Sequence, residues 1–219
     1  MNPFLKAGVL TAVVVMLAFL LVSQIDSARS NELKKSVEAV LAEKQAEEVL
    51  HSYAAAMARN PEELCPYLSS LREKQLGKTY SIAERMQNYE RSNLLNDEYE
   101  MMKVSYFLGL AQMYVSGFEN RKTCDGGEVP LVFFYAEKET CADCMAQNAI
   151  LSKVGERCKN VRIYAFPFDS ELEPVSILVG RYEIKTVPSI VIDDGTALMG
   201  VQSEAELVGR LAKSGASCE

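Results

Sequence analysis

Two cysteines three residues apart, Cys141 and Cys144, are the residues of this chain whose type and spacing carry the most chemistry. They follow the apolar run Val129 to Tyr135, and the sequence predicts that a helix begins at this pair. At a helix start two such thiols can close into a disulfide, and the helix dipole favours a thiolate on the first of them. The spacing therefore predicts redox exchange.

Other uses of a CxxC pair fit this sequence poorly. A zinc site needs four ligands, usually from a second cysteine pair or two histidines, whereas the chain has no second CxxC and a single histidine, His51. Covalent haem attachment would need a histidine after the second cysteine, where Met145 stands. We therefore expect no metal and no organic cofactor, and a static structural disulfide remains the alternative to redox exchange.

Composition sets the broad class of the protein. The 219 residues are 48% hydrophobic, which is enough for the core of one large or two small domains. The formal net charge is -7, and no dense Lys/Arg cluster is present to neutralise several phosphates. Nucleic acid is therefore excluded as a partner.

The N-terminal segment, residues 1–26, is predicted to be a transmembrane anchor. Residues 7–22 carry no charge, and Lys6 at the short N-terminal end favours a cytoplasmic N terminus. A cleaved signal peptide is the alternative, since Ala28 could be the cleavage residue, but Asp26 stands where a small residue is needed. We expect a single-pass protein of the cell membrane whose soluble part is extracytoplasmic.

Residues 27–122 are predicted to form an all-α domain. Apolar residues recur at helical spacing, and the expected helices cover residues 27–59, 60–77, 79–93 and 96–118. The last helix is apolar over a wide face, which predicts the core of a helical bundle, with a groove for a ligand or partner as the alternative. Residues 120–127 are expected to form the linker that follows it.

From residue 129 the hydrophobic pattern changes to short apolar runs. Expected strands cover residues 130–135, 161–166, 189–192 and 196–201, and expected helices cover residues 142–157, 173–182 and a final segment capped by residues 203–206. The first two strands and the helix between them form a right-handed βαβ unit, and the last two strands form a hairpin.

This order of elements, with Val187-Pro188 before the third strand, resembles the thioredoxin superfamily over roughly residues 128–213. The resemblance implies an α/β thioredoxin-like domain, residues 123–219, with a central mixed sheet in the order βαβ-α-ββ-α. It implies that Cys141 is the nucleophile and Cys144 the resolving thiol. It also implies that Pro188 is a cis-proline facing the CxxC pair and that Val187 pairs with an extended substrate.

Departures from the thioredoxin pattern leave the redox direction open. Thr140 stands where thioredoxins have Trp, Ala142-Asp143 replaces Gly-Pro, and Phe133 occupies the place of the buried Asp that assists the resolving cysteine. Asp143 repels a thiolate on Cys141 while the helix dipole attracts it, each by about 1 kcal/mol or less at an exposed site. The sequence does not distinguish an oxidase from a reductase.

The remaining four cysteines bring the total to six, an even number that suits an oxidising compartment. Cys65 lies near a helix start and Cys124 after the last helix of the helical domain, and a Cys65–Cys124 disulfide would close a loop of about 60 residues. The direction of the elements in a thioredoxin-like domain brings Cys158 and Cys218 to the same end, which predicts a Cys158–Cys218 disulfide. Free thiols are the alternative for both pairs.

Together these features predict a membrane-anchored, extracytoplasmic thiol-disulfide oxidoreductase that acts on the cysteines of exported proteins. Its partners would be cysteine-containing exported proteins, a membrane redox protein that recycles the CxxC pair, and the membrane itself through the N-terminal helix. The alternative is a non-catalytic, membrane-anchored helical adaptor whose thioredoxin-like domain is a docking module.

Overall fold

A computed structural model describes residues 61–124, 127–136, 141–193 and 195–219, together with positions 15, 16, 45, 48, 49 and 52. The chain divides into two compact units, Met1–Arg59 and Asn60–Glu219. The predicted transmembrane segment, residues 1–26, and the predicted helix over residues 27–59 lie outside the continuously described ranges. In the part of the chain that the structure describes, no helix is long and apolar enough to cross a membrane.

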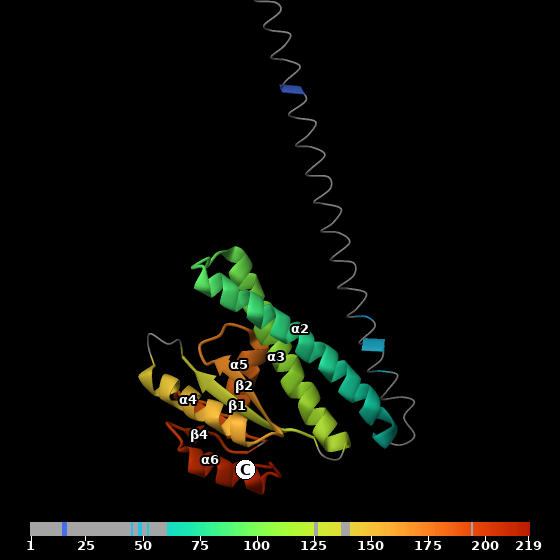
Figure 1. The fold of residues 1–219 in the computed structure, drawn as a ribbon, viewed down its shortest axis with the longest axis vertical. Coiled ribbons are helices and arrows are strands. Elements are labelled where there is room, and N and C mark those ends of the chain that lie inside the picture. The colour runs from blue at the N-terminus through green and yellow to red at the C-terminus, as the bar shows by residue number, and fades with distance from the viewer. Residues whose placement is uncertain are drawn as a thin grey trace, which may run out of the picture. The chain divides into compact units, whose positions relative to one another are not determined.

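The second unit begins with a short 3-10 helix, Pro61–Leu64 (η1), and two long helices, α2 (Cys65–Arg91) and α3 (Asp97–Thr123). They form an antiparallel hairpin and lie side by side (Figure 1). Asn96 caps α3, since its side chain accepts a hydrogen bond from the Tyr99 N–H at 3.1 Å. The hairpin packs closely where Gly109 meets Thr79, because a Cβ at residue 109 would lie 2.8 Å from Thr79 Oγ1.

The prediction of separate helices over residues 60–77 and 79–93 is wrong. The structure has one helix, α2, that runs through Gly77 without a break. A glycine inside a helix costs about 1 kcal/mol relative to alanine, and the packing of α2 along α3 outweighs that local cost. The start also differs, because the α-helix begins at Cys65 with Pro66 in its first turn, after the 3-10 turn that contains Pro61.

The sheet follows α3. Its described strands are β1 (Val129–Tyr135), β2 (Val161–Pro167), β3 (Ser189–Ile192) and β4 (Leu198–Met199), in the order β2-β1-β3-β4. β1 and β2 are parallel, while β3 runs antiparallel to both β1 and β4. The helices between and after the strands are α4 (Ala142–Arg157), α5 (Glu173–Arg181) and α6 (Glu204–Lys213). The prediction of a mixed α/β fold with a helical part is therefore confirmed.

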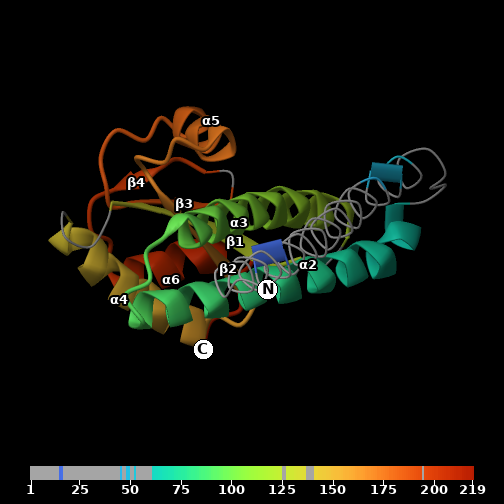
Figure 2. The same ribbon diagram turned by 90° about the horizontal axis from the view of Figure 1, so that it is seen from above.

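Each face of the sheet has its own core, because successive side chains of a strand point to opposite faces. One core joins residues of α3 and α5 to one face of the sheet, and the other joins residues of α4 and α6 to the opposite face. Figure 2 shows these helices on the two sides of the strands. The helix α3 is thus part of the sheet's packing, and the predicted domain boundary at residues 122/123 falls inside the compact unit Asn60–Glu219.

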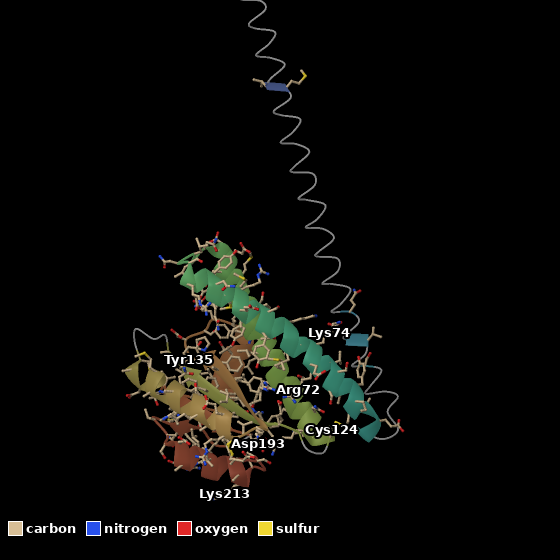
Figure 3. All side chains as sticks on the ribbon, in the orientation of Figure 1. Arg72, Lys74, Cys124, Tyr135, Asp193 and Lys213 are labelled. Carbon is tan, nitrogen blue, oxygen red and sulfur yellow. A yellow bond between two sulfur atoms is a disulfide. The ribbon has the colours of Figure 1, made fainter. Side chains whose placement is uncertain are left out.

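Polar contacts also tie the helical hairpin to the sheet. Glu128, just before β1, forms ion pairs with Arg72 of α2 and, at 2.6 Å, with Arg162 of β2. Figure 3 labels Arg72 beside this region. Tyr164 of β2 donates a hydrogen bond to the Met113 carbonyl of α3 at 3.3 Å. Burial raises the pKa of Tyr164, so this phenol stays a donor at neutral pH.

Candidate functional site

The CxxC pair lies at the N-terminus of α4, the helix that follows β1 in the chain. Cys141 is the N-cap of α4, and its Sγ accepts a hydrogen bond from the Cys144 N–H at 3.1 Å. Cys141 and Cys144 form a disulfide with Cα atoms 5.2 Å apart. The Cys141 side chain is half-buried, whereas Cys144 is only 4% exposed. An incoming thiolate therefore has access to the sulfur of Cys141, and the helix N-terminus stabilises the thiolate that Cys141 becomes on reduction.

A pocket of about 230 Å³ lies beside the buried cysteine. Its walls are mostly apolar and come from the ends of β1 and β2 and the first turns of α4: Phe133, Tyr135, Ala136, Cys144, Met145, Asn148 and Ala165. The rings of Phe133 and Tyr135 stack with centroids 5.7 Å apart. No carboxylate is among the described residues that line this pocket, and Phe133 in its wall is buried.

The loop before β3 reaches the same edge of the sheet. Phe134 pairs with Ser189, so the next antiparallel step places Pro188 beside Tyr135 at the carboxyl end of β1, which Figure 3 labels. The Val187–Pro188 peptide bond is cis. The Pro188 carbonyl accepts a hydrogen bond from the Gly200 N–H at 2.8 Å, whereas no backbone hydrogen bond joins Val187 to another described residue.

The sequence analysis did not single out one polar residue that supports the site. Gln147 lies one turn after Cys144 on α4 and is fully buried. Its Oε1 accepts a hydrogen bond from the Gln202 N–H at 2.6 Å, which holds the loop between β4 and α6 against the CxxC helix. A glutamine in the apolar face of a predicted helix was the one available signal.

The other four cysteines form two disulfides away from the CxxC pair. Cys65 and Cys124, with Cα atoms 5.7 Å apart, join the open ends of the α2–α3 hairpin, and Figure 3 labels Cys124 there. Cys158, the C-cap of α4, is joined to Cys218 near the end of the chain. The two ends of α4 thus each carry a disulfide.

Several sequence-based expectations fall outside the described residues. Lys138 and Thr140, in the connection from β1 to Cys141, and His51 are among them. Across the described ranges, no group of three or more His, Cys, Asp or Glu residues is placed to hold a metal ion.

Comparison with known proteins gives similarities of structure. No family model matches the chain, and no curated protein matches it. The structure is similar to thioredoxin O2 from Arabidopsis thaliana in the oxidised state, with 17% identity, coverage of 47% of this chain and 87% of that one, and a TM-score of 0.37. It is also similar to oxidised thioredoxin from Plasmodium falciparum, with 21% identity, coverage of 40% and 81%, and a TM-score of 0.32. The description of the fold therefore rests on the strand order and directions given above.

Proposed function

We propose that this chain is a thiol-disulfide oxidoreductase that exchanges disulfides with cysteine-containing exported proteins through Cys141 and Cys144. The observation that carries the proposal is the disulfide at the N-terminus of α4, in which one cysteine is accessible and the other is buried. The Val187–Pro188 loop at the same edge of the sheet supplies a backbone for an extended client. Residues 1–26 would anchor the protein in the cell membrane, with the soluble part on the extracytoplasmic side.

The cysteine pairing supports an oxidising compartment. All six cysteines of the chain lie in disulfides, and such dense pairing is typical of exported proteins and rare in the cytosol. A pair that reacts once with each client needs a supply or a sink of electrons, and a membrane redox protein near the anchor would fill that role. No metal or organic cofactor takes part in this scheme.

The reaction consists of two successive thiol–disulfide exchange steps. In the oxidising direction a client thiolate attacks Cys141 Sγ, the Cys141–Cys144 bond breaks, and Cys144 leaves with the electron pair and takes a proton. A second client thiolate then attacks the client sulfur of the mixed disulfide, which completes the client disulfide and releases the Cys141 thiolate. Two electrons pass from client to protein. The reverse steps reduce a client disulfide, and the relative reduction potentials set the direction.

The pocket beside Cys144 suggests which clients react fastest. Its volume, about 230 Å³, suits one large apolar side chain, and Cys144 forms part of its wall. A leucine or phenylalanine near the reacting cysteine of a client can enter this pocket while the client sulfur is bonded to Cys141.

A trapping experiment tests this function. Reduced full-length Cys144→Ser protein in detergent is mixed with a peptide that contains a disulfide, and we expect a stable mixed disulfide because the resolving thiol is absent. The adduct should appear on the tryptic peptide of residues 139–153, which carries position 141. The Cys141→Ser/Cys144→Ser protein is the control and should form no adduct there. Equal adduct formation by both proteins, or none by either, would contradict the proposal.

A further inference from the structure

One outward face of α3 carries four exposed apolar side chains between residues 101 and 115. Met101, Val104, Leu108 and Val115 are 64%, 41%, 44% and 54% exposed. At about 100° per residue, these four side chains lie within an arc of about 60° around the helix. Asp97 and Lys122 fall within the same arc. We refer to the six residues as the α3 stripe: Asp97, Met101, Val104, Leu108, Val115 and Lys122.

The face of α3 that packs on the sheet lies beside this stripe. Phe107, Leu110 and Tyr114 belong to the buried core on that face, and Phe107 is about 60° around the helix from Val104. A helix that is apolar on both sides is usually covered on both sides, because a continuous exposed apolar surface is uncommon on a soluble unit. The stripe therefore indicates a contact surface.

The charges at the two ends of α3 identify the partner. Asp97, Glu98 and Glu100 lie in the first turn, and Arg121 and Lys122 lie in the last. Asp97 and Lys122 are both exposed, and the Lys122 ammonium lies 4.9 Å from the centroid of the Phe118 ring. Two parallel copies of α3 would place like charges together. Two antiparallel copies would place each acidic end beside a basic end.

We propose that two copies of this chain associate through their α3 stripes, with the two α3 helices antiparallel about a two-fold axis. When Asp97 of each copy faces Lys122 of the other, the same register places Val104 opposite Val115 and Leu108 beside the axis. In this register the charged ends of the two helices are complementary, as a two-fold interface requires. This dimer is independent of the redox chemistry of the CxxC pair.

Zero-length cross-linking of mixed isotopes tests the dimer. Unlabelled and nitrogen-15-labelled full-length protein are mixed in detergent and treated with a carbodiimide, which joins a carboxylate to an amine in contact. Asp97 and Lys122 are about 37 Å apart along one helix, so a bond between them requires two copies. We expect Asp97–Lys122 cross-links, about half of them with mixed labels as random pairing in a symmetric dimer requires. Lys159 and Glu219 of one copy lie 3.5 Å apart and should give unmixed cross-links as the internal control.

Variants separate this interface from other contacts. Leu108→Gln should lower the Asp97–Lys122 yield about tenfold or more, whereas Ile177→Gln, at an exposed position of α5 outside the stripe, should leave it unchanged. Asp97→Lys and Lys122→Asp proteins should each be monomeric alone and should form heterodimers when mixed, because both ends then carry opposite charges. Thermal unfolding confirms that each variant is folded.

Three results would overturn the proposal: no Asp97–Lys122 cross-link, a yield that Leu108→Gln leaves unchanged, or failure of the charge-reversed proteins to pair. Cross-links from Lys122 to residues 27–59 in place of Asp97 would also overturn it, since the chain's own N-terminal segment would then occupy the stripe.

Discussion

The two ends of α4 carry disulfides of opposite character. At the N-terminal end, Cys141 and Cys144 are three residues apart, and Cys141 is half-buried. At the C-terminal end, the fully buried Cys158 is joined to Cys218, which lies 60 residues further along the chain. The two disulfides thus differ in burial and in their place on the helix, and we expect their reactivities to differ accordingly.

The helix dipole acts oppositely on the two sulfur pairs. Free N–H groups at the start of α4 stabilise a thiolate on Cys141, whereas the carbonyl groups at its end disfavour one on Cys158. The chain end that carries Cys218 is also held by hydrogen bonds, from the Glu219 N–H to the Arg157 carbonyl at 3.1 Å and from the Ser217 N–H to Asn160 Oδ1 at 2.6 Å. We therefore expect the first disulfide to exchange and the second to stabilise.

The largest expected effect is the loss of exchange when Cys141 is removed. Full-length Cys141→Ser protein should exchange with a dithiol peptide at least about a hundredfold more slowly than the parent protein, because Cys144 is too buried to be attacked directly. The rate is measured by mass spectrometry of the peptide disulfide. An exchange rate within threefold of the parent protein's would place the reactive sulfur elsewhere.

Removal of the disulfide at the C-terminal end of α4 should lower the stability of the protein and leave its rate of disulfide exchange unchanged. Cys158→Ala/Cys218→Ala should lower the free energy of unfolding by about 4 kcal/mol, because the disulfide closes a loop of about 60 residues in the unfolded chain. Denaturant unfolding and the peptide exchange rate are measured on the same full-length protein. The matched control is Cys65→Ala/Cys124→Ala, which removes a disulfide that closes a loop of similar length. A large loss of exchange in a folded Cys158→Ala/Cys218→Ala protein would break the distinction between the two ends.

A smaller effect is expected from filling the pocket beside Cys144. Ala165→Leu should slow exchange with peptides that carry leucine or phenylalanine next to cysteine by about tenfold, a typical value for loss of one buried apolar contact. Exchange with glutathione, which has no such side chain, should be unchanged and is the control for the CxxC chemistry. If exchange with the leucine and phenylalanine peptides slows no more than exchange with glutathione, the pocket does not bind the client.

The smallest expected effect concerns Asp143, in the first turn of α4. Asp143→Asn removes a negative charge that repels the Cys141 thiolate, so the reduced protein gains stability and the reduction potential rises. The expected rise is about 10–20 mV, which corresponds to a fraction of 1 kcal/mol at an exposed site. Asp169→Asn, at an exposed position in the loop after β2, is the control. A fall in potential would show that Asp143 stabilises the thiolate.

Local patterns in the sequence predicted the α/β part better than the helical part. The apolar run of β1 and the Ser203 cap of α6 are encoded by nearby residues, and the structure contains both elements. The continuity of α2 through Gly77 depends on packing along α3, which no local pattern records. The strand β4 is also shorter than predicted and covers only Leu198–Met199.

The candidate site shows the same division. The CxxC spacing and the thioredoxin resemblance singled out Cys141, Cys144 and Val187-Pro188, and the structure places them at one edge of the sheet. The pocket beside Cys144 is formed jointly by β1, β2 and α4, so its shape follows from the tertiary packing of three elements. The hydrogen bond from the Gln202 N–H to Gln147 likewise joins residues 55 apart, beyond the reach of sequence periodicity.

The most direct test of the contrast is a redox titration of the full-length protein that follows each disulfide separately. The protein is equilibrated in glutathione or dithiothreitol buffers of known potential, alkylated and digested with trypsin. The reduced fraction of the CxxC pair is then measured by mass spectrometry of the peptide of residues 139–153, which contains both cysteines. We predict a potential between about -270 and -120 mV for Cys141–Cys144, and potentials below about -300 mV for Cys65–Cys124 and Cys158–Cys218. A Cys141–Cys144 potential below about -300 mV, together with the other two, would contradict a catalytic role.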